Sequence, residues 1–298
     1  MLSRRSFLQS STAAVTTAAL AGVCSSAKAI EPIARNGKPK FKFSLAAYSY
    51  RDLLLPKQGK EPQLTLKDFI DDCAKMGLEG TELTSYYFPK EVTADYVHDL
   101  RRHAFRLGLD VSGTAIGNEF GHPQGEKRDA EIAKTKQWCD YAEMMGAPVI
   151  RIFAGHQQRG QSVEEAHALM VAAIEECCDY AGKRGVYLAL ENHGGPTATA
   201  DGLLKFVHDV RSPWFGVNLD GGNFRGDDPY AELARIAPYA VNAQIKAKVG
   251  GKPADFKRLA KLMRDANYRG YIVLEYEEPG NVREECPRIM NEIREAFA

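Results

Sequence analysis

Residues 186–220 read VYLALENHGGPTATADGLLKFVHDVRSPWFGVNLD and contain one complete strand–helix–strand unit. An apolar strand over 186–190 is followed by a helical pattern over 199–210 and a second apolar strand over 214–219. An acidic residue comes directly after each strand, Glu191 after the first and Asp220 after the second. Short apolar strands that alternate with helices are typical of a parallel sheet that is buried on both faces.

The same alternation extends in both directions along the chain. We predict strands at 41–48, 78–83, 109–116, 148–153, 186–190, 214–219, 240–245 and 271–274, and helices at 65–76, 94–107, 126–145, 162–183, 199–210, 229–236, 253–266 and 282–298. Eight such units predict an α/β protein with a single (β/α)₈ TIM barrel over residues 30–298. A doubly wound open sheet is the alternative, but no G-x-G-x-x-G motif follows the first strand.

The first 29 residues have the pattern of an export signal. The run Ser3-Arg4-Arg5-Ser6-Phe7-Leu8 precedes an apolar stretch of small residues, and Ala27-Lys28-Ala29 forms a small-x-small cleavage site. The paired arginines resemble a twin-arginine signal. We therefore predict that residues 1–29 are removed and that the protein is exported by this route to the periplasm. The apolar stretch is too short to span a membrane.

Composition excludes several classes of function. The chain is 44% hydrophobic, which is typical of a globular protein. It carries 39 Lys+Arg and 39 Asp+Glu, so it lacks the excess of positive charge that is typical of proteins that bind nucleic acid. The five cysteines after residue 29 form no C-x-x-C pair and lie beside apolar residues in helical patterns. We predict that they are small buried apolar side chains without a catalytic role. Both a monomer and a homo-oligomer stay open.

Polar side chains gather at the ends of four successive predicted strands. Glu191, Asp220, Gln244 and Glu275 follow or end strands five to eight, about one β/α unit apart. Catalytic residues of a β/α barrel come from these C-terminal strand ends. Because neighbouring carboxylates repel, a shared divalent cation would stabilise them; separate salt bridges to Lys or Arg are the alternative. The all-oxygen ligand set favours Mn²⁺ or Mg²⁺, with Co²⁺ or Zn²⁺ as substitutes in vitro.

At these residues the chain resembles the xylose isomerase-like TIM-barrel superfamily of sugar phosphate isomerases and epimerases. The run Gln244-Ile245-Lys246 and the ending Leu274-Glu275-Tyr276-Glu277 carry the resemblance, which covers the chain from about residue 41 onward. It implies that Glu191, Asp220, Gln244 and Glu275 hold one metal ion. Two positions depart from the epimerase pattern: Gln244 stands where His is usual, and Asn223 stands where a D-x-x-H motif has His. With Gln at the seventh strand, the chain looks more like the dehydratase branch of the superfamily.

The resemblance implies proton transfer on a carbohydrate through an enediolate. Glu191 and Glu275 are the candidates for taking and returning the proton, and His193 is the candidate for protonating a leaving group in a lyase or dehydratase, the alternative reaction. No fixed phosphate cradle is visible, which favours an unphosphorylated ketose, keto-sugar, glycoside or cyclitol. Further side chains at the predicted mouth are candidates for binding substrate: Glu82, His122, Arg151, His156, Arg225 and Lys246.

Two other classes of protein are less consistent with the residues. A DNA-repair nuclease on the same barrel would hold several zinc ions with many His ligands, and the chain has seven His in all. A sugar-binding protein without catalysis would not need three acids that converge on one point.

Overall fold

Eight parallel strands close into a barrel in the computed structural model, which describes residues 30–56 and 61–298. Neighbouring strands follow the order β1-β10-β7-β6-β5-β4-β3-β2, so each barrel strand pairs with the next barrel strand along the chain and the last pairs with the first. The predicted (β/α)₈ barrel is therefore confirmed, whereas the predicted signal over 1–29 lies outside the described residues. The barrel strands are β1 Lys40–Ala46, β2 Gly80–Thr84, β3 Asp110–Ala115, β4 Val149–Ile152, β5 Tyr187–Glu191, β6 Phe215–Asp220, β7 Ala240–Ile245 and β10 Arg269–Leu274.

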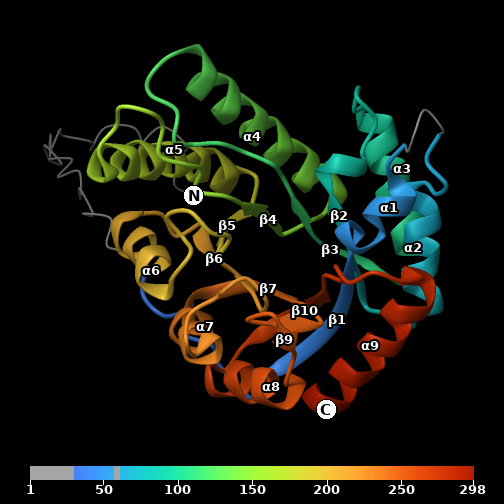
Figure 1. The fold of residues 1–298 in the computed structure, drawn as a ribbon. Helices are drawn as coiled ribbons and strands as arrows, with labels where there is room; N and C mark the ends of the chain where they lie inside the picture. The colour runs from blue at the N-terminus through green and yellow to red at the C-terminus, as the bar shows by residue number, and fades with distance from the viewer. Residues whose placement is uncertain (1–29, 57–60) are drawn as a thin grey trace, which may run out of the picture.

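The helices form a ring outside the strands (Figure 1). The helix predicted over 126–145 ends at Gly146, which adopts the left-handed conformation (φ 74°) that glycine takes at low cost. None of the helices in the described part of the chain is long and apolar enough to cross a membrane. The helices are α1 Arg51–Leu54, α2 Leu66–Lys75, α3 Ala94–Arg106, α4 Glu126–Met145, α5 Val163–Lys183, α6 Ala200–Asp209, α7 Pro229–Ile236, α8 Phe256–Asp265 and α9 Val282–Phe297.

The main apolar core lies between the strands and the helices. Side chains from both layers, such as Leu190 of β5 and Phe206 of α6, are almost fully buried there. All five cysteines in the described residues are buried and unpaired, as predicted from their apolar surroundings. Burial raises the pKa of these thiols, which keeps them protonated and unreactive near neutral pH.

The inside of the barrel is polar. Alternate residues of β7 and of the position after it, Asn242, Gln244 and Lys246, hydrogen-bond or pair with side chains of other barrel strands. The alternation follows from the two-residue period of a strand, which turns every second side chain to one face. The fold therefore carries a column of polar groups from the middle of the barrel to its C-terminal mouth.

Several predicted boundaries differ from the structure by two or three residues, and two of them have a clear cause. The first strand ends at Ala46 rather than at Tyr48, because Ala47–Tyr50 forms a turn of 3₁₀ helix. The helix predicted from Pro253 begins at Phe256, because β9 (Lys252–Pro253) pairs with β8 (Lys248–Val249) in a short hairpin and Asp255 caps the helix. Gly250 and Gly251, both with positive φ, lie between β8 and β9.

The N-terminus of α5 carries the capping box predicted from Ser162 and Glu165. The Ser162 hydroxyl accepts a hydrogen bond from the backbone N–H of Glu165, and the Glu165 carboxylate accepts one from the backbone N–H of Ser162. Two backbone donors at the helix end are satisfied by this exchange.

Ser162→Ala is expected to lower the free energy of unfolding by about 1 kcal/mol, because one of those backbone donors loses its acceptor. Urea unfolding followed by circular dichroism measures the change. Ser162→Asp is the control, since it keeps an acceptor oxygen and should unfold close to the wild type. Equal stability of the Ala variant and the wild type would contradict the capping assignment.

Candidate active site

Four charged side chains from neighbouring strands lie buried at the C-terminal mouth of the barrel. Glu191 ends β5, Asp220 ends β6, Lys246 follows β7 and Glu275 follows β10. Strand register places them near one end of the sheet but staggers them: Glu191 pairs with Asn218 across β5–β6, and Asp220 pairs with Gln244 across β6–β7. The backbone N–H of Glu275 donates to the Ile245 carbonyl at 2.9 Å, and ion pairs through Lys246 join Asp220 to Glu275. The carboxylates that the sequence predicts to converge are thus brought to one mouth.

Lys246 lies among these acids. Its Nζ is 3.2 Å from Asp220 Oδ2, 3.2 Å from Glu275 Oε2 and 3.0 Å from Glu277 Oε2. It also donates to Asn223 Oδ1 at 3.3 Å. One ammonium therefore supplies positive charge to three carboxylates, two of which are buried.

Glu191 has a cation of its own. Arg151, from β4, lies with its Nε 2.9 Å from Glu191 Oε2, and both side chains are almost fully buried. The other oxygen of Glu191 accepts a hydrogen bond from Asn223 Nδ2 at 2.9 Å. Because Asn223 also contacts Lys246, it links the Arg151–Glu191 pair to the Lys246 cluster.

Burial raises the pKa values of Glu191 and Asp220. Burial raises the pKa of Glu191 well above its ordinary value, with Arg151 opposing the shift and the charges of Asp220 and Glu275 adding to it. Burial also raises the pKa of Asp220 to about 7, although Lys246 opposes it. For Lys246 burial alone would lower the pKa, but Asp220 and Glu275 outweigh burial, so the pKa is raised and the amine stays protonated. The cluster is short of positive charge.

Asp220 is held rigidly at one end only. Its backbone N–H donates to Asn192 Oδ1 at 2.8 Å, and its Oδ1 accepts from the Gly222 backbone N–H at 2.8 Å. Its Oδ2 is buried, and within residues 30–56 and 61–298 no donor is aligned to form a hydrogen bond with it. The ion pair with Lys246 is therefore a contact of charge alone, and this oxygen has free lone pairs.

Gln244 and Glu82 form a separate network below the mouth. Gln244 Nε2 donates to Glu82 Oε1 at 2.7 Å, and Gln244 Oε1 accepts from Asn218 Nδ2 at 2.6 Å. Asn242 Nδ2 completes the cycle with contacts to Glu82 Oε2 at 3.0 Å and to Asn218 Oδ1 at 2.9 Å. Burial raises the pKa of Glu82 to about 7, with the charge of Glu275 adding to the shift. Both ends of the Gln244 amide are engaged, and Glu82 is fully enclosed.

The remaining predicted residues lie around the rim. His193 is partly exposed, with its ring 4.4 Å from that of Phe153. Partial burial of the ring and the charges of Arg151 and Lys246 lower its pKa. His156 is exposed and contacts Glu119 Oε2 through Nδ1 at 2.8 Å. His122 is half-buried in the loop after β3, and Arg225 is exposed in the loop after β6. Within the described residues, none of these four side chains forms a hydrogen bond or an ion pair with the clustered acids.

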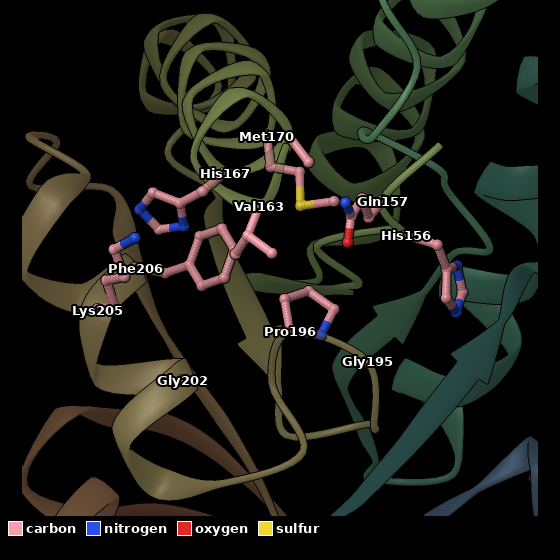
Figure 2. Close-up of a pocket in the computed structure, with 11 residues that line it drawn as sticks. His156, Gln157, Val163, His167, Met170, Gly195, Pro196, Gly202, Lys205 and Phe206 are labelled. Atoms are coloured by element: carbon pink, nitrogen blue, oxygen red, sulfur yellow. The ribbon is translucent and has the colours of Figure 1, made fainter. Parts of the chain in front are cut away.

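An apolar pocket of about 360 Å³ lies outside this mouth (Figure 2). Val163, Met170, Pro196 and Phe206 line it between α5, α6 and the loop after β5. None of the clustered acids lines it, so it is distinct from the charged site.

Sequence reasoning missed the linking residues Asn223, Asn218, Asn242 and Glu277. The alternation Asn242-x-Gln244-x-Lys246 within one strand was a usable signal, since three polar residues two apart share one face. It also predicts that Lys246, rather than Gln244, reaches the rim.

The donor chemistry of the three carboxylates suits a divalent cation. Glu191, Asp220 and Glu275 offer hard oxygen ligands, and one buried oxygen of Asp220 accepts no hydrogen bond within the described residues. As arranged, however, the described residues contain no group of three or more His, Cys, Asp or Glu side chains ready to hold a metal ion. Lys246 takes the central position, and Gln244 turns its amide to Asn218 and Glu82. The carboxylates fit the ion, and Gln244 in this orientation does not.

Several solved structures share the fold. D-psicose 3-epimerase from Clostridium cellulolyticum H10 aligns with a TM-score of 0.71 and 16% identity, covering 86% of this chain and 99% of that one. The 3-keto-D-glucoside 4-epimerase from E. coli gives 0.69 and 14%, covering 87% and 100%. A probable 3-DHS dehydratase from Bacillus anthracis gives 0.67 and 18%, covering 85% and 98%. At these identities the similarity establishes the fold alone.

No curated protein sequence is significantly similar to the chain. Residues 70–293, about three quarters of the chain, match the family of xylose isomerase-like TIM barrels. With the closed barrel and with acids at the ends of β5 and β6 and after β10, this match shows that the chain belongs to the xylose isomerase-like TIM-barrel family.

Proposed function

We propose that the protein is a divalent-metal-dependent isomerase or epimerase of a ketose or keto-sugar. The single observation that carries the proposal is the set of buried acids Glu191, Asp220 and Glu275 at the barrel mouth, which lack enough positive charge. A bound Mn²⁺ or Mg²⁺ ion, held by these carboxylates, would polarise a substrate carbonyl and stabilise negative charge on its oxygen. Structures of sugar epimerases with the same fold support the class of reaction.

Glu191 and Glu275 are the proposed acid–base pair. They lie on β5 and after β10, which are not neighbours in the barrel, so a sugar between them would present opposite faces to the two carboxylates. One removes the proton beside the carbonyl and the other returns it. The raised pKa of Glu191 suits it to the role of base, because a carboxylate that binds its proton more tightly is a stronger base.

Arg151 is proposed to orient Glu191 and to favour its ionised form, since its charge opposes the effect of burial on the Glu191 pKa. Its guanidinium lies against one Glu191 oxygen, while Asn223 donates to the other. The predicted roles of Glu82, His122, His156, Arg225 and Lys246 in substrate binding stay predictions. The enclosure of Glu82 favours a role in organising Gln244 instead of direct contact with a sugar.

We further propose that the substrate is unphosphorylated and that the enzyme works after export. The twin-arginine pattern of residues 1–29 supports export. Because sugar phosphates are rare outside the cytoplasm, export in turn supports an unphosphorylated substrate. A ketose, keto-glycoside or keto-cyclitol fits both arguments.

A lyase or dehydratase is the second candidate, favoured by Gln244 on the seventh barrel strand, where the chain looks more like the dehydratase branch. A probable dehydratase also shares the fold. It needs an acid to protonate the leaving group, and His193 is the predicted donor. The lowered pKa of His193 makes its protonated form scarce near pH 7, which weakens this assignment. The isomerase is therefore the better supported reaction.

Protein loaded with Mn²⁺ and incubated with ketoses and 3-keto-glycosides in D₂O should place deuterium beside the carbonyl of the recovered sugar, without loss of water. Glu191→Gln and Glu275→Gln should each slow this exchange at least about 100-fold, because the proton acceptor is lost. Proton NMR measures the exchange. Asp110→Asn is the control: it removes a carboxylate that pairs with Lys42 at the start of β3, at the other end of the barrel, and should leave exchange unchanged.

Full exchange in both Gln variants would show that the proton-transfer assignment is wrong. A new enone absorbance with release of water would instead identify the lyase.

Removal of metal by a chelator is expected to abolish exchange, and Mn²⁺ or Mg²⁺ should restore it. Metal content by plasma mass spectrometry is measured on the same samples. If samples stripped to far below one ion per chain keep the full rate, metal dependence is refuted.

A further inference from the structure

Lys246 holds the position that a cation shared by the mouth acids would take. Its Nζ lies at 3.2 Å from both Asp220 and Glu275, which are two of the three proposed metal ligands. An ammonium and a metal ion cannot both sit between the same two carboxylate oxygens, since two cations at such short range repel strongly.

The position of Lys246 is built into the fold. Its aliphatic stem passes over Gly222, where an added Cβ would lie 2.8 Å from Lys246 Cδ and 3.0 Å from its Cβ. The side chain is buried, and Asn223 Oδ1 accepts from its Nζ at 3.3 Å. Because Gly222 and Asn223 both belong to the loop that follows Asp220, the loop that presents the ligand also seats the lysine.

Glu277 gives Lys246 a second position. Its Oε2 is 3.0 Å from Nζ, and its side chain is far more exposed than those of Asp220 and Glu275. Because the four-carbon stem of lysine is flexible, Glu277 offers Nζ a partner on the more exposed side of the two inner acids.

We propose that Lys246 is a displaceable internal cation: it neutralises Asp220 and Glu275 before metal arrives, competes with the metal for them, and moves toward Glu277 when the ion binds. The inference rests on the metal site proposed above. It explains why the acids are not arranged around an open point although their chemistry suits an ion. Lys246 thereby sets the metal affinity of the site.

The test is a calorimetric titration of metal-free protein with MnCl₂. Lys246→Met removes the charge and keeps the length of the chain, so Mn²⁺ should bind at least about tenfold more tightly than to the wild type. Lys246→Arg keeps the charge and should bind no more tightly than the wild type. Lys248→Met is the matched control: it makes the same change two residues away, where the lysine pairs with Glu278, and should leave affinity unchanged.

A second readout is the thermal midpoint of unfolding. Metal-free Lys246→Met should melt below the wild type, because the buried acids lose their cation, and Mn²⁺ should raise its midpoint more than that of the wild type. If Lys246→Met does not fold without metal, Lys246→Gln replaces it in both measurements, since its amide can still donate to Asp220.

Equal or weaker Mn²⁺ binding by the Met and Gln variants would overturn the competition while leaving the metal site intact. Failure of the wild type and of every variant to bind Mn²⁺ would overturn both the inference and the metal dependence proposed above.

Discussion

The mouth of this barrel is governed by the burial of carboxylates, whose mutual repulsion adds to the cost of burial. Glu191, Asp220 and Glu275 gather there because three strands of one closed sheet end at the same mouth of the barrel. Arg151 and Lys246 offset part of their charge, yet the pKa values of Glu191 and Asp220 stay raised. Buried acids with raised pKa values cluster at functional sites, so these residues identify the mouth of the barrel as the candidate active site. The proposed metal, base and acid all follow from this one constraint.

A second polar layer supports the mouth from below. The cycle of Glu82, Gln244, Asn218 and Asn242 provides donors to both Glu82 oxygens and to the amide oxygens of Gln244 and Asn218, and it ties β2, β6 and β7 together. Buried hydrogen-bond networks of this kind fix side-chain positions. The strand ends that carry Asp220 and Lys246 therefore start from a rigid base, as a catalytic site requires.

Much of this arrangement could be predicted from the sequence, for physical reasons. Strand and helix periods predict the barrel, and the rule that parallel strands end together predicts that Glu191, Asp220 and Glu275 meet. The partner of each side chain could not be predicted. Gln244 on β7 could face a metal or turn to Glu82 on β2, and it turns to Glu82. Which side chains meet across the interior depends on the tilt of the barrel strands. The central position of Lys246 likewise depends on Gly222, because a side chain at Gly222 would clash with the lysine stem. This contact between the loop after β6 and the residue after β7 could not be predicted from the sequence.

The most direct measurement is a crystal structure of the protein soaked with Mn²⁺, with data collected for the anomalous signal of the metal. The account predicts one peak at the barrel mouth within direct ligand distance of oxygens from Glu191, Asp220 and Glu275, with Lys246 shifted toward Glu277. A mouth without an anomalous peak, with Lys246 still between Asp220 and Glu275 at saturating Mn²⁺, would contradict it.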